Sequence, residues 1–193
     1  MLRTLILSLV LMSINLHAWE PLSEKYCVSF GNEAAPCKII EYFSFACPHC
    51  VALFRKDFSN VKEKLINQNK VSWTFHPVPV DIQTVQAMIC LENLSPPEKR
   101  LFLEVLLEEA EMEDPDITSQ LMKRAMEILK KPLPLLQQKD FISDQPAFQS
   151  AFLFLKQEDI VKTIPSVKIN GKFFAEEVPE CSFVEKYLEA TRE

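Results

Sequence analysis

The sequence predicts an α/β fold in which a mixed sheet is interrupted by a helical insertion. Three observations predict it: an apolar segment typical of a central strand, a long middle region with helical spacing, and a hairpin pattern near the C-terminus. A chain of 193 residues has the length of one domain, or of one domain with an insertion. A purely helical bundle would leave three β-rich segments unexplained.

The first half of the chain predicts a β-α-β unit. Residues 38–45, "KIIEYFSF", are apolar on both faces apart from three positions, as in a strand that is buried on both sides. Residues 47–65 carry apolar side chains at helical spacing, which predicts an amphipathic helix. Residues 71–80 alternate in polarity and then meet two prolines, so we expect a strand that ends in a loop.

The middle of the chain predicts a series of helices. Residues 81–94 have one apolar face. The "SPPE" that follows predicts the start of a second helix, with Ser95 as N-cap and Glu98 completing a capping box. Further helices are predicted over residues 116–130, 132–141 and 145–157.

The C-terminal region returns to β structure before a last helix. In "TIPSVKINGKFF", Asn170 and Gly171 join two β-rich runs, and this pair suits a type I′ hairpin turn, which needs positive φ at both positions. Residues 179–193 predict an amphipathic helix. The order of elements is that of a thioredoxin-like core with an inserted helical domain. The predicted boundaries are residues 19–80 and 158–193 for the thioredoxin-like domain and 81–157 for the insertion.

The N-terminus predicts export. Residues 1–18 have a basic start at Arg3, an apolar run, and a small residue, Ala18, at the expected cleavage point, as in a secretory signal peptide. An uncleaved membrane anchor is the alternative, but the apolar run of about 13 residues is short of the roughly 20 that span a bilayer. We therefore expect a periplasmic protein, in a compartment where disulfides persist.

The charge of the chain disfavours two classes of partner. The formal net charge of −6 becomes −7 when Arg3 is removed with the leader. Nucleic acids and anionic membranes attract basic surfaces, so we expect neither as a partner.

Residues 47–50, "CPHC", carry the chemistry. A zinc site needs four ligands, and no second Cys-x-x-Cys or His-x-x-x-His completes one, so we expect no metal. A purely structural disulfide is also disfavoured, because closing so short a loop removes little freedom from the unfolded chain. Disulfide exchange with other proteins explains the pair best.

Redox chemistry gives each residue of this motif a role. Cys47 follows a strand and opens a helix, where unpaired N–H groups and the helix dipole favour a thiolate. Pro48 suits the first helical turn, and His49 can donate a hydrogen bond or positive charge to the same sulfur. Cys50 lies one turn further in and can resolve a mixed disulfide. No cofactor beyond the Cys47–Cys50 disulfide is expected.

A lowered pKa of Cys47 would also set the direction of exchange. Each pKa unit corresponds to about 1.4 kcal/mol of preferential stabilisation of the thiolate. Because this favours the reduced protein, the disulfide is readily given away, and we expect an oxidant of other proteins.

The segment "EYFSFACPHC" resembles the active-site segment of the DsbA family of periplasmic thiol oxidases. Upstream "GNEAAPCKII", the helical insertion, "TIPSVKINGKFF" and the final helix extend the resemblance over most of the mature chain. It implies a monomeric protein disulfide oxidoreductase that passes its disulfide to reduced secreted or periplasmic proteins through a mixed disulfide. It also implies reoxidation by a membrane partner of the DsbB type.

The resemblance implies roles for single residues. Cys47 would attack and link to the substrate, and Cys50 would resolve. Glu41 matches an acid beneath the disulfide that aids proton movement at the inner cysteine; a strand-edge carboxylate facing solvent is the alternative. Pro165 matches a cis-proline that faces the disulfide, and with Ile164 it would keep a backbone edge open to an extended substrate.

Two positions depart from the family pattern. Phe54 stands four residues after the second cysteine, where family members often carry an acid, so a proton path through that position is altered. Ile164 precedes the proline where oxidases often have valine and isomerases threonine. Both positions are candidates for tuning the potential or the choice of substrate.

Four further cysteines leave three pairings open. Cys27 and Cys37 flank a segment with turn residues, and a structural disulfide between them is the leading hypothesis. Cys90 falls on an apolar helix face, and Cys181 lies at the start of the last helix. His76 is expected to be a strand-end histidine and not a catalyst.

Other functions remain open at this stage. A disulfide isomerase or reductase of the same fold is the nearest, although dimeric isomerases have an added N-terminal dimerisation domain, for which the short segment between Ala18 and Cys27 leaves no room. A non-catalytic periplasmic chaperone or copper carrier would use the same groove or cysteine pair. A glutathione-transferase-like enzyme would not require Cys50.

Overall fold

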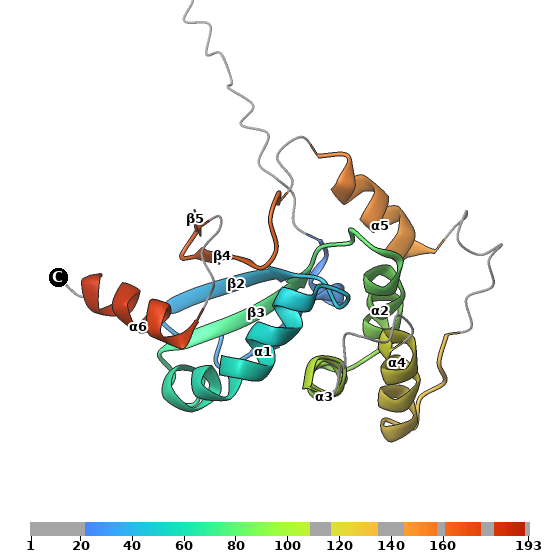
Figure 1. The fold of residues 1–193 in the computed structure, drawn as a ribbon, viewed down its shortest axis with the longest axis horizontal. Helices are drawn as coiled ribbons and strands as arrows, with labels where there is room; N and C mark the ends of the chain where they lie inside the picture. Colours follow the sequence, from blue (N-terminus) through green and yellow to red (C-terminus); the bar gives the residue numbers. More distant parts are fainter. Residues whose placement is uncertain (1–21, 109–116, 135–144, 158–160, 175–179, 192–193) are drawn as a thin grey trace, which may run out of the picture.

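The computed structural model describes residues 22–108, 117–134, 145–157, 161–174 and 180–191, and a five-stranded sheet lies at its centre (Figure 1). The strands are β1 (Val28–Phe30), β2 (Cys37–Phe43), β3 (Val71–Pro77), β4 (Ser166–Ile169) and β5 (Lys172–Phe174). Their order across the sheet is β1-β3-β2-β4-β5, with β2 parallel to β3 and antiparallel to β4. β2 is therefore central, as its apolar sequence predicts.

The helices of the described residues follow the predicted order. They are α1 (Pro48–Val61), α2 (Ile82–Glu92), α3 (Pro96–Glu108), α4 (Ile117–Ile128), α5 (Pro146–Leu155) and α6 (Cys181–Ala190). A 3-10 turn, η1 (Glu24–Tyr26), precedes β1, and a π-helical turn, η2 (Lys62–Ile66), continues α1. In the helix predicted over residues 132–141, residues 132–134 have no regular structure and the rest lies outside the described residues.

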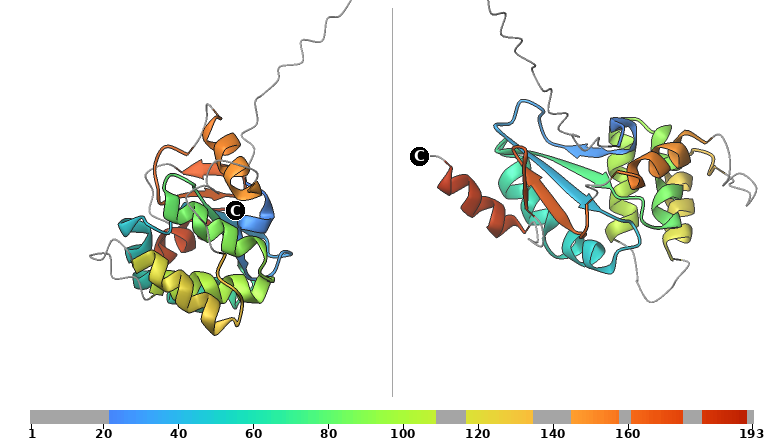
Figure 2. Two further views of the ribbon diagram at one scale, coloured as in Figure 1. Left: turned by 90° about the vertical axis from the view of Figure 1, so that its right-hand side faces the viewer. Right: turned by 90° about the horizontal axis from the view of Figure 1, so that it is seen from above.

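Helices cover both faces of the sheet (Figures 1 and 2). The face under α1, α3 and α6 carries the larger apolar cluster, in which Trp73 and Val167 of the sheet join Val51 of α1 and Val184 of α6. The opposite face packs against η1, α2 and α5 in a smaller cluster. No described helix is both long and apolar enough to cross a bilayer.

The helical insertion lies at one end of the sheet. Helices α2 to α5 fall between β3 and β4 in the sequence, and they gather where the parallel strands β2 and β3 end (Figures 1 and 2). Phe102 of α3 and Leu121 of α4 belong to the same apolar cluster as the sheet residues. The predicted thioredoxin-like fold with a helical insertion is confirmed.

The C-terminal hairpin has the predicted turn. Asn170 and Gly171 both have positive φ, 47° and 86°. The Asn170 side chain accepts a hydrogen bond from the Lys38 N–H at 2.8 Å, and the Asn170 N–H donates to the Lys38 carbonyl at 2.9 Å. The turn is thereby fastened to the beginning of β2, which fixes the register of β4 on the central strand.

The predicted Cys27–Cys37 disulfide is wrong. Strand β3 lies between β1 and β2, with Val28 of β1 opposite Phe75 and Cys37 of β2 opposite Val71. Val28, the neighbour of Cys27, is therefore separated from Cys37 by two strand spacings of about 4.8 Å across the sheet and by four residues of about 3.3 Å each along it. A disulfide needs Cα atoms within about 7 Å. The edge strand β1 is too short to be recognised from its sequence, and it carries Cys27 to the far side of β3.

Candidate active site

Cys47 lies at the junction of the central strand and α1. It is the N-cap residue of α1, with Pro48 in the first turn, and its sulfur accepts a hydrogen bond from the Cys50 N–H at 3.3 Å. An extended backbone at Cys47 (φ −84°, ψ 113°) lets the side chain turn back over the first turn of the helix. The unpaired N–H groups of the helix start therefore point at this sulfur.

This geometry lowers the pKa of the Cys47 thiol to about 6 from the ordinary 9.0. The Cys50 thiol, which donates a hydrogen bond to the thiolate, is the largest cause. Partial burial opposes it, and the backbone N–H groups of Cys50 and His49, with the charge of His49, add to the lowering. The half-buried sulfur of Cys47 is thus acidic and reachable at the same time.

Cys50 has the opposite environment. Its side chain is 1% exposed, on the inner face of α1. Its pKa is raised, first by the hydrogen bond to Cys47, then by burial, and to a lesser extent by Glu41. All six cysteines are free thiols in this structure. Among the two sulfurs of the motif, only that of Cys47 can be attacked from solvent.

Glu41 lies in the sheet beneath the two cysteines and is 3% exposed, which excludes the solvent-facing alternative. Trp73 on β3 donates its indole N–H to Glu41 Oε2 at 2.9 Å. Burial raises the pKa of Glu41 to about 8 from 4.5, against the lowering effect of the Trp73 hydrogen bond. At neutral pH this carboxyl is therefore largely protonated.

An aromatic wall closes the space beside Glu41. Phe54 stacks on Phe58, with ring centroids 4.6 Å apart, and both line a cavity of about 10 Å³ together with Glu41 and Trp73. A cavity of that size holds one water molecule at most. Phe54 occupies the position where the resemblance to the DsbA family leads us to expect an acid, and its ring cannot carry a proton.

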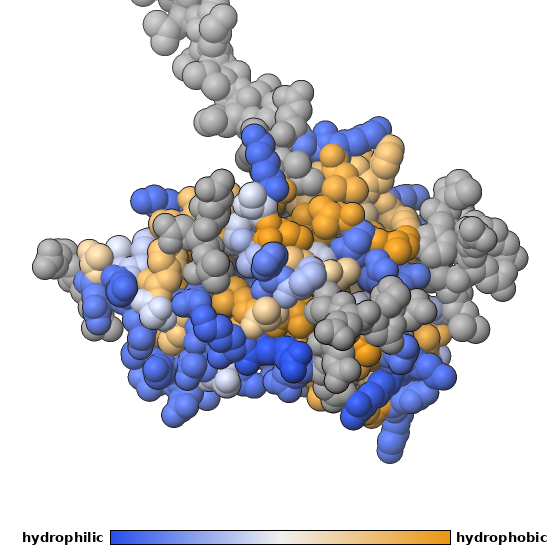
Figure 3. Space-filling view, viewed as in Figure 1, coloured by the Kyte–Doolittle hydropathy of each residue, from blue (hydrophilic) through white to orange (hydrophobic). Residues whose placement is uncertain are grey.

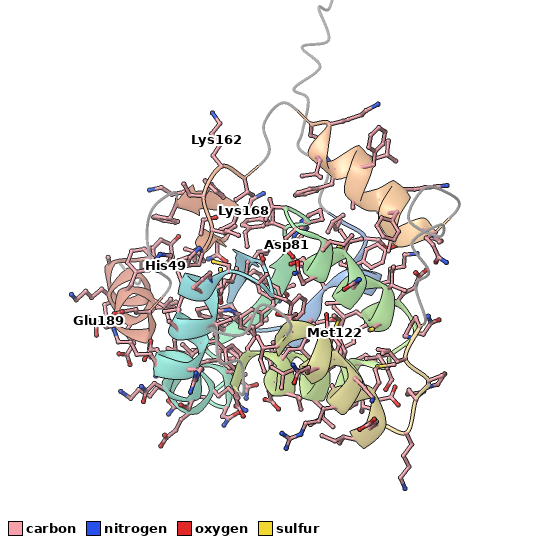
Figure 4. The ribbon with its side chains drawn as sticks, turned by 45° about the vertical axis from the view of Figure 1, so that its right-hand side comes forward. His49, Asp81, Met122, Lys162, Lys168 and Glu189 are labelled. Carbon is pink, nitrogen blue, oxygen red and sulfur yellow. The ribbon has the colours of Figure 1, made fainter. Side chains whose placement is uncertain are left out.

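The segment before β4 faces the outer cysteine. The Ile164–Pro165 peptide bond is cis, as the resemblance implies. The carbonyl oxygen of Ile164 lies 3.9 Å from Cys47 Sγ, and both Ile164 and Pro165 are half-buried. His49 is exposed in the first turn of α1 (Figure 4). The structure thus brings together all seven residues predicted for the site.

The sequence did not reveal Trp73 as the partner of Glu41. The available signal is a buried carboxylate predicted on one strand and a tryptophan on the next, since a buried acid needs a donor. His76 occupies the end of β3, as expected for a strand-end histidine. Its Nε2 accepts the Leu22 N–H at 2.9 Å, and burial lowers its pKa to about 4.

Exposed apolar side chains gather on α5, where Phe152, Leu153 and Leu155 face solvent (Figure 3). The apolar cluster beneath α5 includes Ile164 at its margin, which connects this region with the segment next to Cys47.

Within the described ranges, no group of three or more His, Cys, Asp or Glu side chains is placed to hold a metal ion.

Comparison with known proteins places the chain in a family. The model of the family Thioredoxin_4, described as thioredoxin, matches residues 23–189. The chain belongs to this thioredoxin family. No curated protein matches it.

Solved structures share the fold of this thioredoxin-family chain at low identity. Oxidised BdbD from Bacillus subtilis is 20% identical with a TM-score of 0.64, covering 88% of this chain and 95% of that one. Alpha-DsbA1 from Wolbachia pipientis is 20% identical with a TM-score of 0.65, covering 88% and 92%. A protein-disulfide isomerase from Novosphingobium aromaticivorans is 13% identical with a TM-score of 0.61, covering 87% and 98%. The resemblance to the DsbA family is thus confirmed in the fold.

Proposed function

We propose that the protein is an exported thiol:disulfide oxidoreductase that donates its Cys47–Cys50 disulfide to folding secreted proteins. One observation carries the proposal: the reachable sulfur, Cys47, is stabilised as a thiolate, whereas Cys50 is buried with a raised pKa. A protein whose reduced form is stabilised in this way gives its disulfide away.

The reaction proceeds by two exchanges. A substrate thiolate attacks Cys47 Sγ, the Cys47–Cys50 bond breaks, and Cys50 leaves as a thiolate that takes the proton of Glu41. A second substrate thiolate then attacks the substrate sulfur of the mixed disulfide, and Cys47 leaves as a thiolate. The substrate loses two electrons and gains a disulfide, and the protein gains both electrons as a dithiol.

The surroundings of Cys47 support an unfolded protein as substrate. The Ile164 carbonyl offers a backbone acceptor beside the sulfur, which suits an extended chain. Exposed apolar side chains on α5 suit the apolar segments that a folding protein has not yet buried. We infer that the protein acts as a monomer in the periplasm and that a membrane partner of the DsbB type reoxidises it.

Equilibration with glutathione tests this function. We expect an oxidising potential, well above the value of about −270 mV found for thioredoxin, and oxidation of a reduced client protein. Cys47→Ser should abolish exchange, and Cys50→Ser should accumulate mixed disulfides. Cys27→Ser is the matched control, because Cys27 lies outside the site, and it should leave exchange unchanged.

Other outcomes would assign another function. A potential near that of thioredoxin would make the protein a reductase. Repair of scrambled disulfides without net oxidation would make it an isomerase. Stoichiometric metal retained on purification would indicate a carrier.

A further inference from the structure

Residues 44–47, which lead into α1, are held by hydrogen bonds among themselves and to the start of α2. The Phe45 N–H donates to Thr84 Oγ1 at 3.1 Å. The Ala46 N–H donates to Ser44 Oγ at 3.1 Å, and the Cys47 N–H donates to the Ser44 carbonyl at 3.2 Å. Each N–H of the loop from Phe45 to Cys47 therefore has a fixed acceptor.

A carboxylate of the helical insertion orients these acceptors. Asp81 is the N-cap of α2, and its Oδ1 accepts the Thr84 N–H at 2.6 Å. Its Oδ2 accepts the Ser44 hydroxyl at 2.5 Å and lies 2.9 Å from Thr84 Oγ1. The two hydroxyl oxygens are 3.1 Å apart. Figure 4 shows Asp81 at the start of α2, beside the end of the central strands.

The chemistry of the three groups gives this arrangement a direction. An ionised carboxylate only accepts hydrogen bonds, so it takes up hydroxyl hydrogens and leaves the hydroxyl lone pairs for the loop N–H groups. Ser44 is 1% exposed and Thr84 is 0% exposed, so water cannot replace either partner. A cap requires only one acceptor, and here the second oxygen of Asp81 is used outside its own helix.

The position of the Cys47 sulfur depends on this loop. Its hydrogen bond from the Cys50 N–H is already long at 3.3 Å, so a small shift of Cys47 weakens it. The backbone of Ser44 also contacts the Cys50 sulfur and lowers its pKa. Thr84 and Asp81 touch neither sulfur among the hydrogen bonds described, so any influence they have passes through the loop.

We propose that Ser44, Asp81 and Thr84 form a positioning network through which the helical insertion sets the acidity of Cys47. The network deepens the proposed function, on which its biological use depends. Thr84 and Asp81 are positioning residues and not catalytic ones, because they act on Cys47 through the backbone of residues 44–47. The insertion then tunes the redox centre as well as covering it.

Substitution of Thr84 tests the network. Thr84→Val keeps the shape but removes the acceptor of the Phe45 N–H, and we expect the acidity constant of Cys47 to fall about threefold to tenfold. Thr84→Ser restores the hydroxyl and should return the value to that of the unmodified protein. Thr74→Val is the matched control, since Thr74 also contacts a serine hydroxyl, that of Ser29 at 2.9 Å, but on the strand pair β1–β3.

The readout is a titration of thiolate absorbance in the reduced protein, together with the glutathione equilibrium. The pKa is raised for every other thiol, by burial for Cys27, Cys37, Cys90 and Cys181 and first by the hydrogen bond to Cys47 for Cys50, so the low-pH step belongs to Cys47. Thr84→Val should shift both measurements by the same factor, toward a more stable disulfide. A purely structural role would lower the melting temperature and leave the pKa in place.

Asp81→Asn separates position from charge. Asparagine still caps α2, but it replaces one acceptor oxygen by an N–H₂ donor. If positioning governs, the pKa of Cys47 rises; if the charge of Asp81 governs, its removal lowers the pKa, and the proposal is overturned.

The proposal and the proposed function fail separately. An ordinary pKa for Cys47 in the unmodified protein would end the oxidant assignment. A low pKa that persists in Thr84→Val would end only the network. Should Thr84→Val not fold, Ser44→Ala, which removes the acceptor of the Ala46 N–H, is titrated in its place with the same expected rise and the same overturning result.

Discussion

At the scale of single residues, two cysteines of one helical turn have opposite properties. Cys47 is the N-cap and receives the N–H groups of the helix start, whereas Cys50 faces the core above Glu41. The same hydrogen bond between the two sulfurs lowers the pKa of one and raises that of the other. The proton that Cys50 retains at neutral pH is therefore part of what keeps Cys47 ionised.

Replacement of Glu41 should change how stability depends on pH. The folded-state pKa of about 8 exceeds the ordinary 4.5, so the folded protein binds an extra proton between these values and its stability falls as pH rises. His76 has the opposite effect, but only between its folded value of about 4 and its ordinary 6.5. Between pH 6.5 and 8 the oxidised protein should lose about 2 kcal/mol.

Urea unfolding of oxidised Glu41→Gln at several pH values checks this, because the disulfide removes the two active-site thiols from the titration. The loss between pH 6.5 and 8 should disappear in this variant. Glu180→Gln, which alters only an exposed ion pair with Lys56, should keep it. A slope that survives in Glu41→Gln would show that Glu41 is already ionised.

At the scale of elements, two glycine turns hold the sheet together in different ways. Gly31 follows β1 and Gly171 lies between β4 and β5, and both have φ near +87°. A Cβ at Gly31 would meet the Val71 carbonyl oxygen at 2.9 Å, whereas a Cβ at Gly171 would meet nothing within 4 Å. Conformation alone requires glycine at the second turn, and both conformation and space require it at the first.

Alanine at these two positions should therefore differ in cost. Gly171→Ala places a side chain in the left-handed region and should destabilise the protein by about 1–2 kcal/mol. Gly31→Ala adds a collision with the backbone of β3 and should cost clearly more. Gly171→Asn is the control, since asparagine tolerates this region, and it should cost least. Denaturant midpoints measure the order, and equal losses for the two alanine variants would contradict it.

At the scale of the whole molecule, one core joins the sheet and the insertion. The large apolar cluster runs from Trp73 in the sheet to Phe102 of α3 and Leu121 of α4. Phe45, in the loop that leads into α1, packs edge-on against Phe102, with ring centroids 6.2 Å apart. The protein should therefore unfold as one unit. Oxidation or reduction of Cys47 and Cys50 should change the free energy of unfolding of the whole protein.

The reduced protein should gain stability relative to the oxidised protein as pH rises. The folded-state pKa of Cys47 is lowered from 9.0 to about 6, so its thiolate adds stability that grows between these values and is lost as pH falls through 6. Allowing for solvent screening of a half-exposed sulfur, the gain is roughly 2 kcal/mol.

Melting temperatures of the reduced and oxidised forms at pH 5, 7 and 9 measure this gain. From pH 5 to pH 9, the melting temperature of the reduced form should rise relative to that of the oxidised form. Cys47→Ser has neither the thiolate nor the disulfide, so its melting temperature should show no such rise relative to that of the oxidised unmodified protein. A difference between the two forms that stays constant with pH would contradict the assignment.

Local pattern predicted much of this molecule, and contacts between distant segments were beyond it. The apolar β2, the proline-started α1 and the Asn170–Gly171 turn are each encoded within a few residues, so the place of Cys47 could be predicted. The Trp73–Glu41 and Thr84–Ser44 pairs join residues 32 and 40 positions apart. The wrong Cys27–Cys37 pairing has the same origin, because closeness along the chain does not give the order of strands.

The continuous core also constrains how such a protein can be re-engineered. Helices α2 to α4 share their apolar core with the sheet, so they cannot be removed or exchanged for those of a relative as an independent unit. Any graft would have to bring with it a ring like Phe102 to meet Phe45, and an acid and a threonine at the head of α2. A chimera without these residues would keep the fold of the parent, but the pKa of its Cys47 thiol would differ.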